Sequence, residues 1–183
     1  MRPGLPIDPK TVFAGKRVCI RPIEVCDTQM LLSWRNSDYV IKNFFYRNPL
    51  SEAEHLNWLE KKVNKGLVYQ FIVCLNETGE PVGCVYFQGY DPENNSMESG
   101  LFMSPDTLRG KGLAGEAYGL MLFDFGRDCL GLSRAYARIL QENKASIRVH
   151  EKLGFKRIEE QEIPIVPTGE PAKSYLMVCD LNN

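Results

Sequence analysis

The stretch 108–115 constrains the fold of this chain more than any other segment, because it places a glycine-rich turn between an apolar strand-like run and an amphipathic helix. Glycines let the backbone approach a ligand closely, and the first N–H groups of a helix have no partners within the helix. Such a turn is suited to hold a phosphate group. Arg109 and Lys111 add positive charge beside it.

Three kinds of phosphate-binding turn compete for these residues. Residues 110–115 read G-x-G-x-x-G, but a dinucleotide site needs this turn after the first strand of a βαβ sheet, with an acid about 20 residues later. Here the turn comes past mid-chain, after hairpin-like strands, and no acid ends the next strand at that distance. The spacing of a P-loop is absent as well.

The third pattern is Arg-x-x-Gly-x-Ala at Arg109, Gly112 and Ala114, followed by Asn143-x-x-Ser146 and by Glu-Lys-Leu-Gly-Phe at 151–155. In order and spacing, these motifs resemble the GNAT superfamily of acetyl-CoA-dependent N-acetyltransferases. The resemblance implies the GNAT acyl-CoA N-acyltransferase fold, an α+β fold whose central, mixed and mostly antiparallel sheet is flanked by helices. It covers roughly residues 15–181.

Composition narrows the classes of partner. The 183 residues fit one domain, 1–183, with 1–14 as an extended N-terminal segment. The 22 basic and 23 acidic residues nearly cancel, so no nucleic-acid partner is expected. Six scattered cysteines and two histidines predict free thiols and no metal site. No signal peptide or membrane span is apparent, which predicts a cytoplasmic protein with no membrane partner.

Apolar periodicity predicts one strand, two helices, three antiparallel strands, a helix, a strand, another helix and one or two final strands. Ser51 and Glu54 form a capping box, while Asp27 and Asn143 are placed to cap two other helices. The expected strands are 17–23, 69–75, 81–87, 96–104, 133–141 and 173–181, and the long helix after the glycine-rich turn is 112–129.

Acetyl-CoA is the co-substrate that the resemblance implies, and its binding residues follow from the matching motifs. The family's equivalent strand runs beside the pantetheine arm, and the glycine-rich turn binds the diphosphate. The residues assigned in this way are Leu101, Phe102, Met103, Arg109, Gly110, Lys111, Gly112, Leu113, Ala114, Gly115, Asn143 and Ser146.

Two residues are candidates for catalysis. An amine with a pKa near 10.4 is almost fully protonated at pH 7, so acetyl transfer needs a base or a site that lowers the amine pKa. Glu98 is the candidate base, because it lies on the strand that leads to the turn; otherwise it is a solvent-facing carboxylate paired with a cation. His150 stands where the family commonly has a tyrosine that protonates the leaving thiolate, and it either donates that proton or terminates its helix.

The acceptor residues are expected in the first two helices, at Trp34, Arg35, Asn36 and His55. This region resembles the branch that acetylates amino groups of nucleotide-linked deoxy sugars. Rings there can stack on a base or sugar and Arg can bind phosphate, although both tryptophans also suit helix packing.

The resulting prediction is an N-acetyltransferase that moves an acetyl group from acetyl-CoA to a primary amine, on a nucleotide-linked amino-deoxy sugar or similar small molecule. The alternatives are a ribosomal-protein-type N-terminal acetyltransferase and a non-catalytic acetyl-CoA sensor. A homodimer is compatible with the sequence.

Overall fold

A computed structural model describes residues 3–107 and 112–182. Its eight strands form one sheet in the order β1-β2-β3-β4-β5-β6-β8-β7, and every neighbouring pair is antiparallel except β5 and β6. The strands are β1 (Phe13–Ala14), β2 (Val18–Pro22), β3 (Val68–Leu75), β4 (Pro81–Asp91), β5 (Ser96–Met103), β6 (Arg134–Leu140), β7 (Lys156–Pro164) and β8 (Pro171–Asp180). The mixed, mostly antiparallel sheet flanked by helices confirms the predicted fold class.

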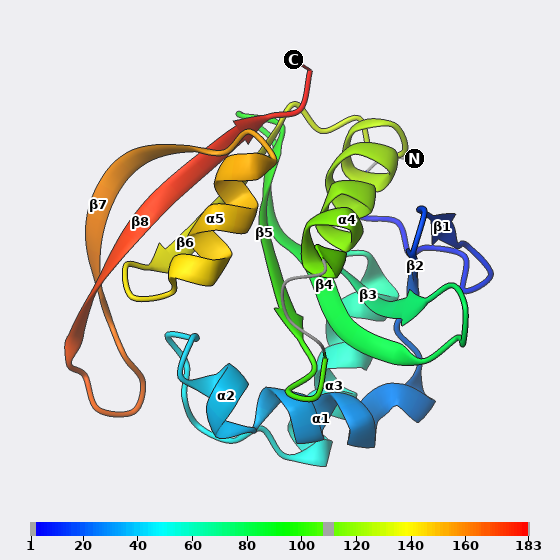
Figure 1. Ribbon diagram of the computed structural model, residues 1–183, viewed down its shortest axis with the longest axis horizontal. Helices are drawn as coiled ribbons and strands as arrows, with labels where there is room; N and C mark the ends of the chain where they lie inside the picture. The colour runs from blue at the N-terminus through cyan, green and yellow to red at the C-terminus, as the bar shows by residue number, and fades with distance from the viewer. Residues whose placement is uncertain (1–2, 108–111, 183) are drawn as a thin grey trace.

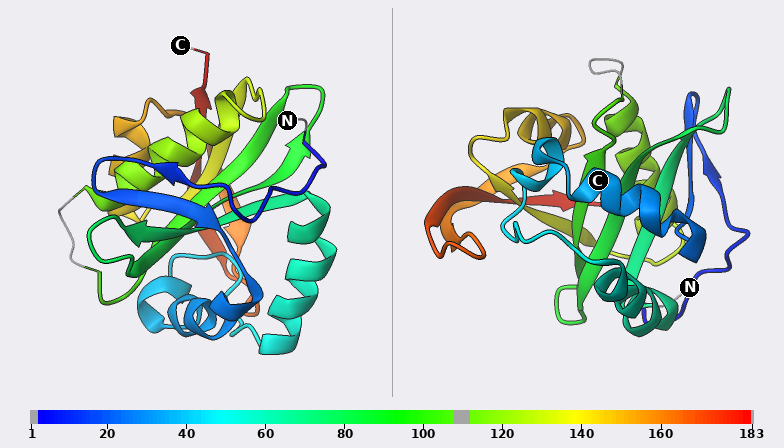
Figure 2. Two further views of the ribbon diagram at one scale, coloured as in Figure 1. Left: turned by 90° about the vertical axis from the view of Figure 1, so that its right-hand side faces the viewer. Right: turned by 90° about the horizontal axis from the view of Figure 1, so that it is seen from below.

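Helices cover both faces of the sheet (Figures 1 and 2). On one face lie η1 (Val25–Asp27), α1 (Thr28–Arg35), α2 (Asp38–Ile41), α3 (Glu52–Lys61) and η2 (Val63–Lys65); on the other lie α4 (Leu113–Gly119), its continuation η3 (Leu120–Arg127) and α5 (Lys144–Lys152). Each layer buries its own apolar cluster against the sheet. The central strand β3 is therefore apolar on both sides and buried along nearly its whole length.

Helix caps explain several boundaries, with one correction. Ser51 and Glu54 form the predicted capping box, and the Asn143 side chain accepts from the Ser146 N–H at the start of α5. Asp27 was expected to cap a helix, but its carboxylate makes no such bond to α1. It pairs instead with the Arg21 guanidinium, 2.7 Å away, and accepts from the Glu24 N–H.

The predicted helix 112–129 is divided into an α-helical part, α4, and a π-helical part, η3. The wider turns of a π-helix shift the phase of the side chains relative to a regular helix. In η3 this phase places the Phe125 ring against the rings of Tyr69 and Phe71, with centroids 5.0 and 4.9 Å away. Packing against the sheet therefore accompanies the change in helix type.

The pairing of β5 with β6 ends early and opens the sheet. Residues 96–98 of β5 pair in parallel with 134–136 of β6, and the strands then part, while β5 stays bonded to β4 and β6 to β8. Figure 1 shows β7 and β8 as a long hairpin that lies beside β6 and extends away from β5. No helix within residues 3–107 or 112–182 has the length and apolar character needed to cross a membrane.

Candidate active site

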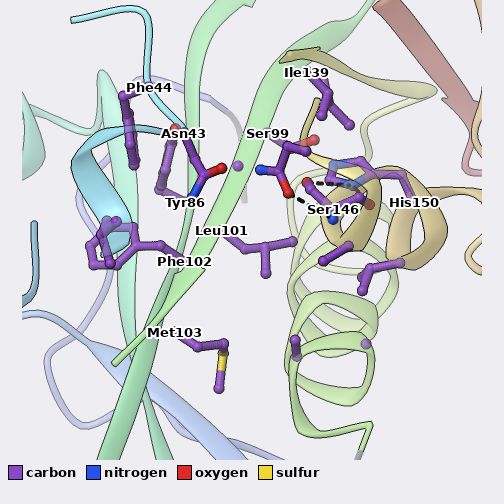
Figure 3. A pocket seen from close by; sticks show the side chains of 18 of the residues that line it. Asn43, Phe44, Tyr86, Ser99, Leu101, Phe102, Met103, Ile139, Ser146 and His150 are labelled. Atoms are coloured by element: carbon purple, nitrogen blue, oxygen red, sulfur yellow. Dashed lines mark hydrogen bonds between the residues drawn. The ribbon is translucent and has the colours of Figure 1, made fainter. Parts of the chain in front are cut away.

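A cavity of about 540 Å³ occupies the opening between β5 and β6. One wall comes from β5 and the first turn of α4, and the opposite wall from β6 and α5. The loop after α2 and the residue Tyr86 of β4 add an aromatic wall on the side of α1–α3. Figure 3 shows Phe44, Asn43 and Tyr86 on one side, and Ser146 and His150 on the other.

Every predicted cofactor residue that the structure describes lines this cavity. The backbone segments 101–103 and 112–115 meet there with Asn143 and Ser146 of α5, although they are far apart in sequence. Arg109, Gly110 and Lys111 lie outside the described residues. The Phe102 side chain points into the α1–α3 cluster and packs on Phe44, with ring centroids 5.9 Å apart.

Two glycines shape the cradle at the start of α4. Gly112 has φ +73°, a left-handed conformation that favours glycine, and it precedes the first helical residue. Gly115 lies within the helix, and a Cβ added there would meet no atom within 4 Å. Both residues line the cavity. The absence of a side chain at Gly115 therefore leaves space at the cavity wall that a larger residue would fill. The residues present therefore fit an elongated phosphate-bearing ligand such as acetyl-CoA.

The strand period places two neighbouring polar residues on opposite faces of the sheet where β5 and β6 part. Glu98 is the last β5 residue paired with β6, and it contacts Gln88 of β4 and Arg138 of β6. Ser99 faces the other layer, where its hydroxyl lies 2.6 Å from the Tyr118 hydroxyl of α4. Both residues line the cavity, so it is reached by a carboxylate from one face and a hydroxyl from the other.

Glu98 is held by two side chains. Its Oε1 accepts from Arg138 Nη1 at 3.0 Å and its Oε2 accepts from Gln88 Nε2 at 3.2 Å, with 21% of its side chain exposed. Arg138 supplies the cation pairing that the alternative interpretation of Glu98 expects. Glu98 is also the only carboxylate among the described residues that line the cavity. Glu98 therefore lies at the cavity surface even though it is paired with Arg138.

His150 belongs to a buried chain of hydrogen bonds. Its Nδ1 lies 2.8 Å from the Ser146 carbonyl oxygen, which can only accept, so Nδ1 carries the proton. Burial lowers the pKa of His150 from 6.5 to about 4, so at pH 7 its Nε2 is an acceptor for the Tyr118 hydroxyl, 2.9 Å away. The Tyr118 oxygen also lies 2.6 Å from the Ser99 hydroxyl, whose other partner is the Tyr136 carbonyl oxygen at 3.1 Å. Tyr118, fully buried, was missed by the sequence analysis.

This arrangement argues against the expected acid role of His150. The proton on Nδ1 is bound to a carbonyl, and Nε2 already accepts from Tyr118. A neutral imidazole bonded in this way has no proton to give to a thiolate in the cavity. The geometry instead makes His150 a residue that ties α5 to α4 and, through Tyr118 and Ser99, to β5.

The low pKa of His150 predicts a stability change with pH. Between pH 6.5 and about 4 the unfolded chain binds a proton at this residue and the folded chain does not. The free energy of unfolding should therefore fall by about 3 kcal/mol as pH drops through this window. Urea unfolding of the wild type and of His150→Gln measures it: the wild-type curve should fall more steeply. Parallel curves would contradict the assignment, and His55 remains in both proteins as a common background.

The four residues predicted to bind the acceptor do not line the cavity. Trp34 packs in the α1–α3 cluster, and the Asn36 side chain binds both backbone groups of Leu50. His55 is buried beside the Thr28 hydroxyl. Their side chains make contacts within the helical layer, because the apolar face of each helix turns toward the sheet.

Arg35 lies one layer behind the aromatic wall. It is 6% exposed, donates to the Tyr46 carbonyl at 2.7 Å, and stacks on the Phe44 ring with its Cζ 3.8 Å from the centroid. Its Nη1 has no partner among the described residues. Burial lowers the pKa of Arg35 below its usual range. Arg35 thus supports the wall residues Phe44 and Tyr46 rather than contacting the cavity itself.

The aromatic wall depends on close backbone contacts. The Tyr86 ring lies across Gly100 on the neighbouring strand, where a Cβ would approach it to 2.3 Å. The loop that carries Phe45 is bonded to the tip of the β7–β8 hairpin, through Arg47 N to Val166 O and Val166 N to Phe45 O. A glycine within a strand signals such a close approach, and Gly100 could therefore have indicated the ring.

Comparison with known proteins identifies the family. The acetyltransferase (GNAT) domain model matches residues 17–156, more than half of the chain. An uncharacterized protein of Methanocaldococcus jannaschii is 31% identical over 152 residues, which are 81% of this chain and 30% of that protein. The chain thus spans under a third of that relative. Spermidine N(1)-acetyltransferase of Escherichia coli K12 is 28% identical over 138 residues, covering 75% of this chain and 72% of the enzyme.

Solved structures share the fold. Spermidine N-acetyltransferase from Vibrio cholerae, in complex with CoA and spermine, superposes with a TM-score of 0.80 at 19% identity, covering 90% of this chain and 96% of that one. A ribosomal L7/L12 alpha-N-protein acetyltransferase in complex with coenzyme A gives a TM-score of 0.81 at 12% identity, covering 94% and 99%. At these identities the likeness concerns the fold alone.

Proposed function

The chain belongs to the acetyltransferase (GNAT) family, and on that premise we propose that it acetylates a primary amine of a nucleotide-linked amino-deoxy sugar or a similar small anionic molecule. One observation carries the proposal. The opening between β5 and β6 has the glycine cradle of α4 at one end and, where the strands part, Glu98, the one carboxylate among its described lining residues, beside an aromatic wall.

When bound, acetyl-CoA supplies the acetyl group as a thioester. Gly115 leaves room for its diphosphate, and segment 101–103 is no longer paired with β6, so its main-chain groups are available for the pantetheine amides. Glu98 accepts the proton of the attacking amine, directly or through water. The new N–C bond forms as the C–S bond breaks, and the departing thiolate takes its proton from solvent.

The charges around the cavity argue against a polyamine acceptor. The described lining residues include one carboxylate, Glu98, and three cations, Arg138, Arg148 and Lys152. A polyamine carries several positive charges and would be repelled by this excess. Although relatives include spermidine acetyltransferases, the lining here favours an acceptor with anionic and ring-shaped parts, which aromatic side chains can stack against.

A panel of amines tests the proposal. CoA release with acetyl-CoA would be measured for a nucleotide-linked 4-amino-4,6-dideoxy sugar, spermidine, an aminoglycoside and peptides with free N-termini. The sugar nucleotide is expected to show the highest kcat/KM. Faster turnover of spermidine or of a peptide would overturn the proposed acceptor. Tight CoA binding without thiol release on any amine would support the sensor alternative instead.

A further inference from the structure

Arg138 holds the candidate base while keeping most of its own donors available. Only its Nη1 contacts Glu98, at 3.0 Å, and 39% of its side chain is exposed. Glu98 is its one hydrogen-bond partner among the described residues; the Tyr136 ring, 5.5 Å from Cζ, flanks it. A guanidinium has five N–H groups, so Arg138 can bind a second anion without leaving the cavity wall.

We propose that Arg138 selects acceptors that carry an anionic group close to the amine, and that binding of this group loosens the Glu98–Arg138 pair so that Glu98 can take the amine proton. This inference rests on the proposed function, because it uses Glu98 as the base. Arg138 is then a specificity-determining residue, and its partner is a phosphate or carboxylate of the acceptor.

Competition between two anions for one guanidinium gives the physical basis. A carboxylate bound to a cation is a weaker proton acceptor than a free one, because the neighbouring charge favours its ionised form. A phosphate of the acceptor offers Arg138 a bidentate partner, which is a stronger contact than the single bond to Glu98. The amine proton then moves to Glu98 as nitrogen bonds the acetyl carbon and the thiolate departs. An amine without an anionic group leaves the pair in place.

The test compares matched amines in two variants. The nucleotide-linked amino sugar and the same free amino sugar would be assayed with wild type, Arg138→Gln and Arg138→Lys. We expect the wild type to prefer the anionic acceptor in kcat/KM by about 10- to 100-fold, as for one charge-assisted contact. Arg138→Gln should lose this preference through a higher KM for the nucleotide sugar, and Arg138→Lys should recover part of it.

A second measurement does not depend on turnover. The dissociation constant of UDP, used as an acceptor-site probe, is measured by isothermal titration of the CoA-bound protein and should rise about tenfold or more in Arg138→Gln. Arg134→Gln is the matched control, because Arg134 is exposed on the same strand and does not line the cavity. An unchanged preference and an unchanged UDP dissociation constant in Arg138→Gln would overturn the inference, even if the sugar is acetylated. Absence of turnover on every amine, with UDP binding that still weakens in Arg138→Gln, would count against the proposed function alone.

Discussion

Glu98→Gln is expected to lower kcat of acetyl transfer by about 100- to 10,000-fold at neutral pH, the range typical for loss of a general base. Glutamine matches the shape of glutamate and can still meet Gln88, but its amide accepts no proton. The deficit should be largest at low pH, where unprotonated amine is scarcest. Steady-state kinetics with saturating acetyl-CoA between pH 6 and 9 measure the effect.

Stability should change little in this variant. The Glu98–Arg138 pair is partly exposed, and pairs of this kind contribute about 0–1 kcal/mol. Glu93→Gln, an exposed carboxylate in the turn between β4 and β5, is the matched control and should keep wild-type rates. If Glu98→Gln also kept wild-type rates across pH, Glu98 would be a structural partner of Arg138 and the mechanism would need another base.

The sequence could bring the predicted cofactor residues to one cavity because their signals are local. A glycine-rich turn before a helix and an asparagine at a helix start are each recognised from a few neighbouring residues. These residues can therefore be located without knowledge of the tertiary fold. Segment 112–115, Asn143 and Ser146 all line the cavity. The spacing along the sequence does not give the distance in space between these segments. That distance depends on where β5 and β6 separate.

The predicted acceptor residues do not line the cavity, for a related reason. Trp34, Arg35 and His55 lie on short helices. For such helices the sequence identifies the apolar face but not the part of the protein against which that face packs. Here that face covers the sheet, and the cavity is lined instead by the loop after α2. Arg138 carried a usable signal, because Arg134, Tyr136 and Arg138 alternate with buried residues on β6 and so share one face.

The hydrogen-bond chain of Ser99, Tyr118 and His150 had no local signal. Its members are 19 and 32 residues apart, and each side chain taken singly suits a core position or a helix end. Their contacts depend on how α4 and α5 pack on β5. The consequence for chemistry is large, since this packing lowers the pKa of His150 to about 4 and removes the proton that the sequence-based expectation had assigned to it.

Gly115→Leu is expected to weaken acetyl-CoA binding by about 100-fold or more, a loss of about 2.7 kcal/mol, without unfolding the chain. A side chain here enters open space within the cavity wall, since a Cβ at this position meets no atom within 4 Å. Leucine is also a better helix former than glycine, by up to about 1 kcal/mol, so the melting temperature should hold or rise. Isothermal titration with acetyl-CoA and thermal unfolding measure the two effects.

Gly115 separates binding from folding better than Gly112 does. Gly112→Val should also abolish cofactor binding, but a β-branched residue at φ +73° adds backbone strain, and the strain would lower stability as well. Gly119→Ala is the matched control on the same helix, because its Cβ makes an ordinary 3.7 Å contact with Leu153 and does not reach the cavity. If Gly115→Leu bound acetyl-CoA with wild-type affinity, the start of α4 would not be part of the cofactor site. The proposed orientation of the acetyl group toward Glu98 would then lose its support.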